Sequence, residues 1–304
     1  KQNNYTDILA RAIHINAGIW ANKLSAIAGA NQIASVQPPS HPDHLAQPVA
    51  IAADPNESKP VFAIDIGLLG NMYAGLGRLI GTEDGLGVRN RGTIAMNQGE
   101  FTVVSAGIVD NTGRITSASN LHIQAQGGLI NGAPNSIGEK AKITAPGTMQ
   151  LHTPGNIDNH GIIVAQNGLT LIANGQHSTI TSHRDATLAA GLADDGKTLI
   201  GQAPLQLKAT KKIALHGINQ ASGDITASAH ALDLSHSQTS AQNIDLNAQA
   251  HDLTARYATI NADKQLKASA INQLITDYGT LSAPDLQLGA AHLSNIGGTL
   301  THTG

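Results

Sequence analysis

Short stretches in which apolar and polar residues alternate recur along this chain. One of them, GRITSASNLHIQAQGGLIN, covers residues 113–131. Three sets of alternating apolar positions are Leu121, Ile123 and Ala125; Leu169, Leu171 and Ala173; and Leu286, Leu288 and Ala290. A period of two residues is that of a β-strand with one buried face, whereas a helix repeats every 3.6 residues. The pattern therefore predicts short strands and does not favour helices.

The alternating stretches return at a nearly constant interval. Copies begin at Gly92, Gly113, Gly161 and Gly279, looser copies begin at Lys142 and Gly223, and one more begins at Gly297. The starts at 92 and 113, and at 279 and 298, lie 21 and 19 residues apart. A fixed period of about 20 residues is typical of a repeat architecture. Each copy has room for three short strands separated by Gly, Asn, Asp or Pro, with no two-residue Asn-Gly hairpin turn. We therefore predict an all-β fold, a three-sided parallel β-helix with about 20 residues per coil and short projecting hairpins or loops.

The composition supports a core made of stacked aliphatic rungs. Only 2% of the 304 residues are aromatic, and 32 are glycine. In a narrow stack with about 4.8 Å between layers, a large ring is expected to clash with its neighbours. Asparagine suits the corners, where its side chain can bond to backbone left unpaired by the bend. The corner candidates are Asn111, Asn131, Asn159 and Asn295.

Charge and chain-level signals exclude several classes of protein. The formal net charge of −3 leaves no basic face for phosphates, so a nucleic-acid partner is not expected. The most apolar run, residues 62–81, is interrupted by Asp65, Asn71 and Arg78, so no transmembrane segment is expected. The absence of cysteine fits either a cytosolic protein or an exported one without disulfides. Because the first residues carry neither an initiator Met nor a signal peptide, we expect a part of a longer or processed protein.

Two sequence motifs resemble phosphate-binding loops but lack the required context. Residues 191–198, GLADDGKT, fit the pattern G-x-x-x-x-G-K-[ST]. That loop needs a helix to follow it, and here Gly201 and Pro204 follow instead, while Asp194 and Asp195 repel phosphate. The run GLGRLIG from Gly75 misses the dinucleotide-binding pattern. We therefore expect a polar loop tip at 191–198 and no cofactor.

Other polar clusters are weak candidates for chemistry. His41, Asp43 and His44 form the closest histidine pair, but they lie in a Pro-rich stretch and lack further ligands. A glycan-processing site would need neighbouring carboxylates, and the acids one coil apart, Asp224 with Asp245 and Asp233 with Asp252, differ in phase within the repeat. Lys208, Lys211 and Lys212 form a small basic cluster that suits either an exposed loop or acidic glycans. No catalytic, cofactor-binding or metal-ligating residue is predicted.

Two blocks ahead of the repeats are more specific than the period. YTDILARAIHINAGIWANKLSAIAGANQI, residues 5–33, and FAIDIGLLGNMYAGLGRLIGTEDGLGVRNRGTI, residues 62–94, closely resemble filamentous haemagglutinin family exoproteins. The similarity lies where the two-partner secretion domain ends and the haemagglutinin repeats begin. It implies a right-handed parallel β-helix that folds after export by a dedicated outer-membrane partner transporter. The Asn-Pro-Asn motifs of the secretion domain are missing from the sequence, so we expect recognition by the transporter to need other residues.

The resemblance also implies an organisation and a role. Residues 1–36 correspond to the end of the secretion domain, 37–60 to a Pro/His-rich loop or linker, 61–91 to a junction that continues the β-helix, and 92–304 to repeats with an irregular insertion near 181–222. The expected role is the structural shaft of a secreted, cell-surface exoprotein of a Gram-negative bacterium. Such a shaft presents a distal adhesive or toxin domain, as in adhesins and contact-dependent growth inhibition effectors. A host or neighbouring-cell receptor would be bound by regions outside this segment. The alternatives are a β-helix polysaccharide-processing enzyme and a haem-protein-capturing exoprotein of the same secretion class.

Overall fold

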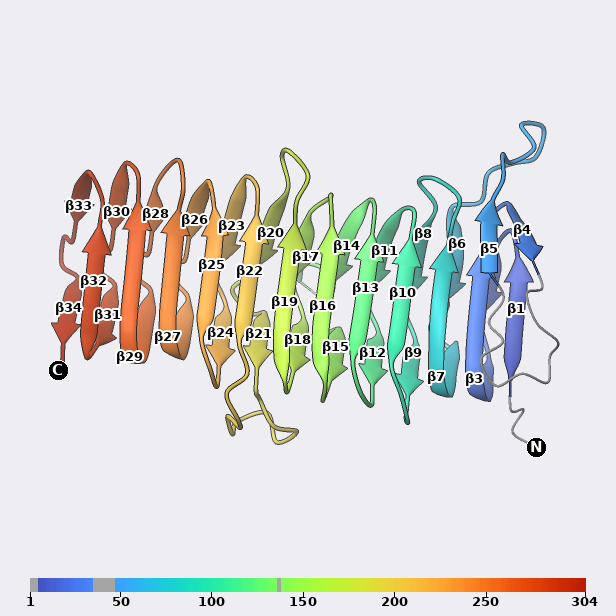
Figure 1. The fold of residues 1–304 in the computed structure, drawn as a ribbon, viewed down its shortest axis with the longest axis horizontal. Coiled ribbons are helices and arrows are strands. Elements are labelled where there is room, and N and C mark those ends of the chain that lie inside the picture. The colour runs from blue at the N-terminus through green and yellow to red at the C-terminus, as the bar shows by residue number, and fades with distance from the viewer. Residues whose placement is uncertain (1–4, 35–46, 136–137) are drawn as a thin grey trace.

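The protein is one continuous coil of β-strands in the computed structural model, which describes residues 5–34, 47–135 and 138–304 (Figure 1). The described residues contain strands but no helix, and they form a solenoid of about 13 turns with about 21 residues per turn. Strands on the near side run upward while the coil advances from the N-terminus at the right to the C-terminus at the left, so the winding is right-handed (Figure 1). The predicted parallel β-helix is confirmed.

Each turn contributes strands to three faces, and the strands of each face pair in parallel with their equivalents on the neighbouring turns. Face 1 consists of β2 (Ile13–Ile15), β6 (Phe62–Ile66), β8 (Gly87–Asn90), β11 (Ile108–Asn111), β14 (Gly128–Asn131), β17 (Ile157–Asn159), β20 (Thr179–Ser182), β23 (Lys212–Leu215), β26 (Ala231–Asp233), β28 (Leu253–Thr254), β30 (Gln273–Ile275) and β33 (His292–Ser294). Face 2 contains β9 (Thr93–Met96), β12 (Arg114–Ser117), β15 (Lys142–Ala145), β18 (Ile162–Ala165), β21 (Thr187–Ala190), β24 (Ile218–Ala221), β31 (Thr280–Ala283) and β34 (Thr299–His302). Face 3 contains β1 (Thr6–Ala10), β10 (Phe101–Ser105), β13 (Leu121–Ala125), β16 (Thr148–Thr153), β19 (Gly168–Ala173), β22 (Leu205–Ala209), β25 (Ile225–Ala229) and β32 (Asp285–Gly289). Four longer strands, β3 (Gly18–Ala28), β7 (Asn71–Gly81), β27 (Gln238–Ala248) and β29 (Thr259–Ala270), run through the corner and join faces 2 and 3.

The core consists of aliphatic side chains stacked turn upon turn. On face 2, Ile94 pairs with Ile115, Ile115 with Ile143, and Ile143 with Ile163, and all four are at most 2% exposed. Their neighbours along each strand point outward, which is the alternation expected of a half-buried strand. Burying one such side chain contributes about 1.5 to 3 kcal/mol. The stability of the solenoid therefore rests on columns of like residues.

The one fully buried aromatic ring occupies a position where the neighbouring turn lacks a side chain. Among the aromatic side chains of the described residues, this ring is that of Phe101, which is 0% exposed. Its register partner on the preceding turn is Gly77. The expectation that rings clash inside the coil therefore holds only where both neighbouring turns carry side chains. Trp20 and Tyr73 instead stack on each other from adjacent turns, with ring centroids 5.9 Å apart.

The corner after face 1 contains a ladder of buried amides. The Nδ2 atom of Asn90 donates to Asn111, Asn111 to Asn131, and Asn131 to Asn159, over distances of 2.8 to 2.9 Å. Asn159 in turn donates to the Ser182 hydroxyl over 3.3 Å. Further along the same column Thr276 donates to Asn295 over 2.9 Å. All four asparagines proposed as corner residues lie in this one column. Asn111, Asn131 and Asn159 are hydrogen-bonded to one another inside the bend, whereas Asn295 is half-buried and has Thr276 as its side-chain partner.

In the described part of the chain, the extra residues leave the coil at its corners. Residues 132–141 connect β14 to β15, and residues 191–204 connect β21 to β22 and extend from the edge of the solenoid (Figure 1). Within the span 181–222, where an insertion is predicted, β21 to β24 keep the register of their neighbours, so the additional residues are confined to the loop 191–204. Near the N-terminus β4 (Asn31–Ala34) pairs in antiparallel fashion with β5 (Gln47–Ala50), which begins the described part, residues 47–60, of the predicted linker. Between residues 61 and 91, β6 to β8 continue the coil.

Candidate functional site

The loop that matches the phosphate-binding pattern is a closed hairpin. Leu192 and Leu199 form an antiparallel bridge, and the Asp195 carboxylate accepts hydrogen bonds from the backbone N–H groups of Lys197 and Thr198 over 2.9 and 2.8 Å. The hydrogen bond from the Thr198 hydroxyl, supported by these two backbone bonds, holds the pKa of Asp195 below its usual range. The donors that a phosphate would need are thus already bound to a carboxylate. The geometry is that of a polar loop tip.

The paired carboxylates considered from the sequence do not face each other. Asp245 lies beside Thr226 in the register, while Asp224 accepts a hydrogen bond from Asn243 over 2.7 Å. Asp233 forms an ion pair of 2.9 Å with Lys212. Burial alone would raise the pKa of Asp233, but the hydrogen bonds from Lys212 and Ser235 outweigh it and the pKa is lowered. The register thus gives these acids separate partners and no shared acid–base geometry.

The histidine pair and the basic cluster considered from the sequence remain to be placed. His41, Asp43 and His44 lie outside the described residues. Of the basic cluster, Lys208 and Lys211 are exposed, and Lys212 is the partner of Asp233. The cluster therefore offers two free-standing cations at the surface of β22 and the following turn.

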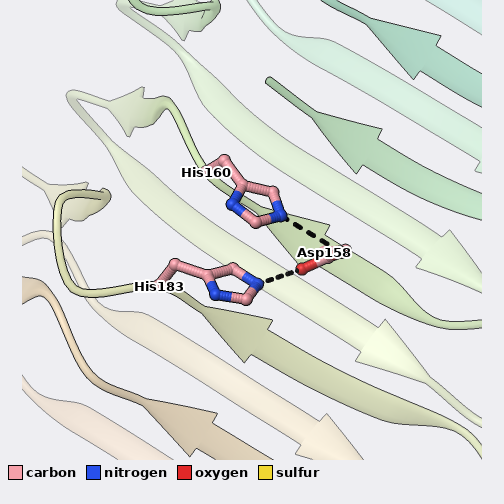
Figure 2. A group of neighbouring side chains, drawn as sticks. All are labelled: Asp158, His160 and His183. Atoms are coloured by element: carbon pink, nitrogen blue, oxygen red, sulfur yellow. Dashed lines mark hydrogen bonds and ion pairs between the residues drawn. The ribbon is translucent and has the colours of Figure 1, made fainter. Parts of the chain in front are cut away.

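The structure brings together three residues that the sequence analysis does not single out: Asp158, His160 and His183 (Figure 2). Asp158 is the outward residue of β17, His160 follows two residues later at the corner, and His183 occupies the equivalent corner of the next turn, directly after β20. Their ligand atoms all lie within 4.8 Å of one another, the only such group of three among the described residues. The one available signal in the sequence is the Asp-x-His spacing, and only the register identifies its third member.

Both imidazoles approach the same carboxylate. The Nε2 atom of His183 lies 2.7 Å from Oδ1 of Asp158, and Nε2 of His160 lies 3.4 Å from Oδ2. The two rings are stacked, with centroids 3.7 Å apart and planes 11° apart (Figure 2). The His160 side chain is 13% exposed and the His183 side chain 42% exposed. The cluster therefore has one fixed ring and one ring that is free to adjust.

A hollow of about 740 Å³ adjoins this cluster. Its walls are the loop after β14, with Lys140 donating to the backbone carbonyl of Asp185, and the corners of successive turns. The lining histidines are His160, His183, His216 and His236. Four imidazoles from four turns thus lie along one recess at the corner.

A second polar cluster lies on face 1 near the N-terminus. Asp65 accepts two hydrogen bonds from Arg89, of 2.9 and 2.7 Å, and lies 3.2 Å from His14 and 3.5 Å from Arg91. The hydrogen bonds from Arg89 hold the pKa of Asp65 below its usual range. Burial raises the pKa of Asp110, which lies beside Arg89 on the next turn. These groups lie on four successive turns and interact electrostatically from one turn to the next.

The chain matches one family of repeats and is similar to proteins that share one protein name. The profile of the family described as "Haemagglutinin repeat" matches residues 26–152, 135–217, 178–242, 220–283 and 279–304. Over 99% of its length the chain is 33% identical to a protein of Yersinia pestis named "Toxin CdiA", and over 97% it is 29% identical to "16S rRNA endonuclease CdiA" of Enterobacter cloacae. Over 91% it is 32% identical to "tRNA nuclease CdiA-2" of Burkholderia pseudomallei.

The matched relatives are much longer than this chain. The chain spans about 8% of the length of each of these three relatives. No solved structure gives a significant match. In the described part of the chain there is no helix of the length and apolarity needed to cross a bilayer.

Proposed function

Since the chain belongs to the haemagglutinin-repeat family, we propose that it is a section of the shaft of a secreted, cell-surface exoprotein and holds a distal adhesive or toxin domain away from the producing cell. The observation that carries this proposal is the unbroken parallel pairing of equivalent strands along the described coil, from β1 and β2 to β33 and β34. About 13 turns at about 4.8 Å per turn give a rod section of about 60 Å.

The architecture favours a mechanical role over a catalytic one. Each turn contacts only its neighbours, so length can be extended without a new core. The nuclease names printed for the relatives describe proteins of which this chain covers about 8%, and we assign that activity to other parts of such proteins. The glycan-processing alternative draws no support from the register of Asp224 and Asp245.

Export completes the proposal. A chain without cysteine can pass an outer-membrane transporter without forming disulfides in the periplasm, and a coil can fold turn by turn as it emerges. The partner in this step would be a dedicated outer-membrane transporter of a Gram-negative bacterium. Receptor contact would belong to regions beyond this segment.

The test is a deletion in the full-length exoprotein that removes whole turns. Thr93 can be joined to Ile260, because Ile94 and Ile260 occupy the same column, seven register steps apart. We expect export and surface display to be retained and the fibre, measured by electron microscopy, to be shorter by about 35 Å. The matched control deletes one residue fewer, which turns the core side chains of the joined strand outward and should abolish folding. Unchanged fibre length after the in-register deletion would refute the shaft role.

A further inference from the structure

We propose that Asp158, His160 and His183 bind a divalent transition-metal ion of the zinc class and that this ion joins two successive turns of the solenoid. The three side chains supply two imidazole nitrogens and one carboxylate, and their ligand atoms lie within 4.8 Å of one another. Asp158 and His160 belong to the turn of β17, and His183 to the turn of β20. A bound ion would therefore connect the two turns through side chains outside the core (Figure 2).

The distances between the ligand atoms are close to those within a metal site. Zinc binds imidazole nitrogen and carboxylate oxygen at about 2.0 to 2.2 Å in a tetrahedron, so ligand atoms in one shell lie about 3.3 Å apart. In the structure the Nε2 atom of His160 lies 3.4 Å from Asp158 and that of His183 lies 2.7 Å from it. Of these two distances, the second has to increase, and the rings have to move apart from their stacked arrangement. The more exposed ring of His183 can make this movement at the corner after β20.

The backbone on both turns is held in place by the buried ladder. Asn159, which separates the Asp158 and His160 ligands, donates to the hydroxyl of Ser182 over 3.3 Å, and Ser182 directly precedes His183. Asn159 and Ser182 are register partners and are at most 1% exposed. A site supported by rigid elements loses little entropy when its ligand binds. The ladder thus fixes where the three ligand side chains start.

The ligand set selects the class of ion. Two imidazoles with one carboxylate suit zinc and the neighbouring transition metals, whereas calcium and magnesium require mostly oxygen ligands. A fourth position remains for water, and the hollow lined by His160 and His183 gives solvent access to it. The charged residues that line the same hollow are Lys140, Arg184 and Asp185, so the lining carries both signs. The Asp158 carboxylate supplies the negative charge that a bound cation requires.

Zinc titration of the purified chain tests the site. We expect one zinc ion per chain by isothermal titration calorimetry and a zinc-dependent rise of several degrees in the unfolding temperature, because a ligand that binds only the folded state stabilises it. Cobalt in the same site should give the visible absorption of tetrahedral nitrogen and oxygen ligation. The substitutions H160Q, H183Q and D158N should each weaken zinc binding at least about 100-fold.

The matched control is a second histidine pair on adjacent turns. His230 and His251 are both exposed, with ring centroids 6.4 Å apart, and do not belong to a group of three ligands. The double substitution H230Q/H251Q should leave the zinc affinity, the temperature shift and the cobalt spectrum unchanged. Circular dichroism without metal checks that every variant is folded. Equal zinc binding by wild type and H183Q, or loss of binding in the control alone, would overturn the proposal.

Discussion

Asn111 and Asn131, twenty residues apart in the chain, occupy the same corner of adjacent turns, and a hydrogen bond of 2.8 Å runs from Nδ2 of Asn111 to Oδ1 of Asn131. Both side chains are 0% exposed. Asn111 also accepts a hydrogen bond from Asn90, so its amide is bonded on both sides. A buried polar column of this kind stabilises only when each member has its partners.

Substitution of Asn111 by Ala should therefore destabilise the chain. It removes the nearest of the three acceptors of the Asn90 amide and the donor to the side-chain carbonyl of Asn131, and a buried group left unpaired costs about 1 to 3 kcal/mol. We expect a loss of about 2 to 4 kcal/mol in the free energy of unfolding, measured by urea denaturation. The control N261A, at an exposed position of β29, should change it by less than about 0.5 kcal/mol. Similar midpoints for the two variants would argue against a stabilising ladder.

Gly77→Val should show how tightly the interior is packed around the buried ring. A Cβ atom at residue 77 would lie 2.8 Å from the sulfur of Met96, and the register partner of Gly77 is Phe101. Overpacking of this kind costs about 1 to 3 kcal/mol. The unfolding midpoint in urea should fall accordingly, and the double variant G77V/F101L should recover part of the loss. If the double variant were no more stable than G77V, the valine side chain at residue 77 would not be displacing Phe101.

Asp65→Asn should weaken the chain at neutral pH but not in acid. The pKa of Asp65 is lowered in the folded state, chiefly by the hydrogen bonds from Arg89. The stabilisation is therefore present above the unfolded pKa of about 3.9 and is lost as the pH falls through the folded value. At pH 7 we expect a loss of about 1 to 3 kcal/mol, and this difference from wild type should shrink below about pH 4. Thermal unfolding between pH 2 and 7 measures it, with D263N on the exposed side of β29 as the control.

Asp110→Asn should change the stability in the opposite direction and stabilise the chain at neutral pH. Burial raises the pKa of this carboxyl, so its ionised form opposes folding at neutral pH and the penalty falls as the pH drops through the folded pKa. The neutral amide removes the penalty. A gain below about 1 kcal/mol at pH 7 is expected, because the side chain is only partly buried. The same thermal series would contradict this if D110N were less stable than wild type at pH 7.

Replacement of the loop residues 193–199 by a short Gly-Ser linker, which keeps the buried Leu192, should leave the solenoid intact. The flanking strands β21 and β22 each pair with strands of both neighbouring turns. Loop length changes the free energy of unfolding only slowly, by about 0.6 kcal/mol per doubling. Urea denaturation should therefore give a change below about 1 kcal/mol. Loss of folding would show that the hairpin contributes to the core.

The alternation at Leu121, Ile123 and Ala125 was sufficient to predict the strands, because a period of two has one structural meaning. The repeat length then predicted parallel stacking and placed Asn111, Asn131, Asn159 and Asn295 at corners. The loop at 132–141 was not predicted, since a corner accepts extra residues without disturbing the pattern on either side. Phe101 fits inside the core because its register partner on the preceding turn is Gly77. This pairing follows from the register between turns, which cannot be predicted from the residues around either position.

The cluster at Asp158 was missed for the same reason. Asp158 and His183 are 25 residues apart, and this interval differs from the mean period. Only the pairing of Asn159 with Ser182 shows that the two turns bring the side chains together. The acids Asp224 and Asp245 are the converse case, because their spacing of about one period does not place them in the same column.

The register between turns also determines which changes in length such a gene can tolerate. Ile94 and Ile115 are 21 positions apart, while Ile115 and Ile143 are 28 apart because the loop 132–141 lies between them. Duplications of entire repeats and insertions at bends preserve the inside-outside pattern, whereas a single-codon deletion within a strand reverses it. Descendants of one ancestral gene can therefore diverge widely in reach while keeping the same cross-section.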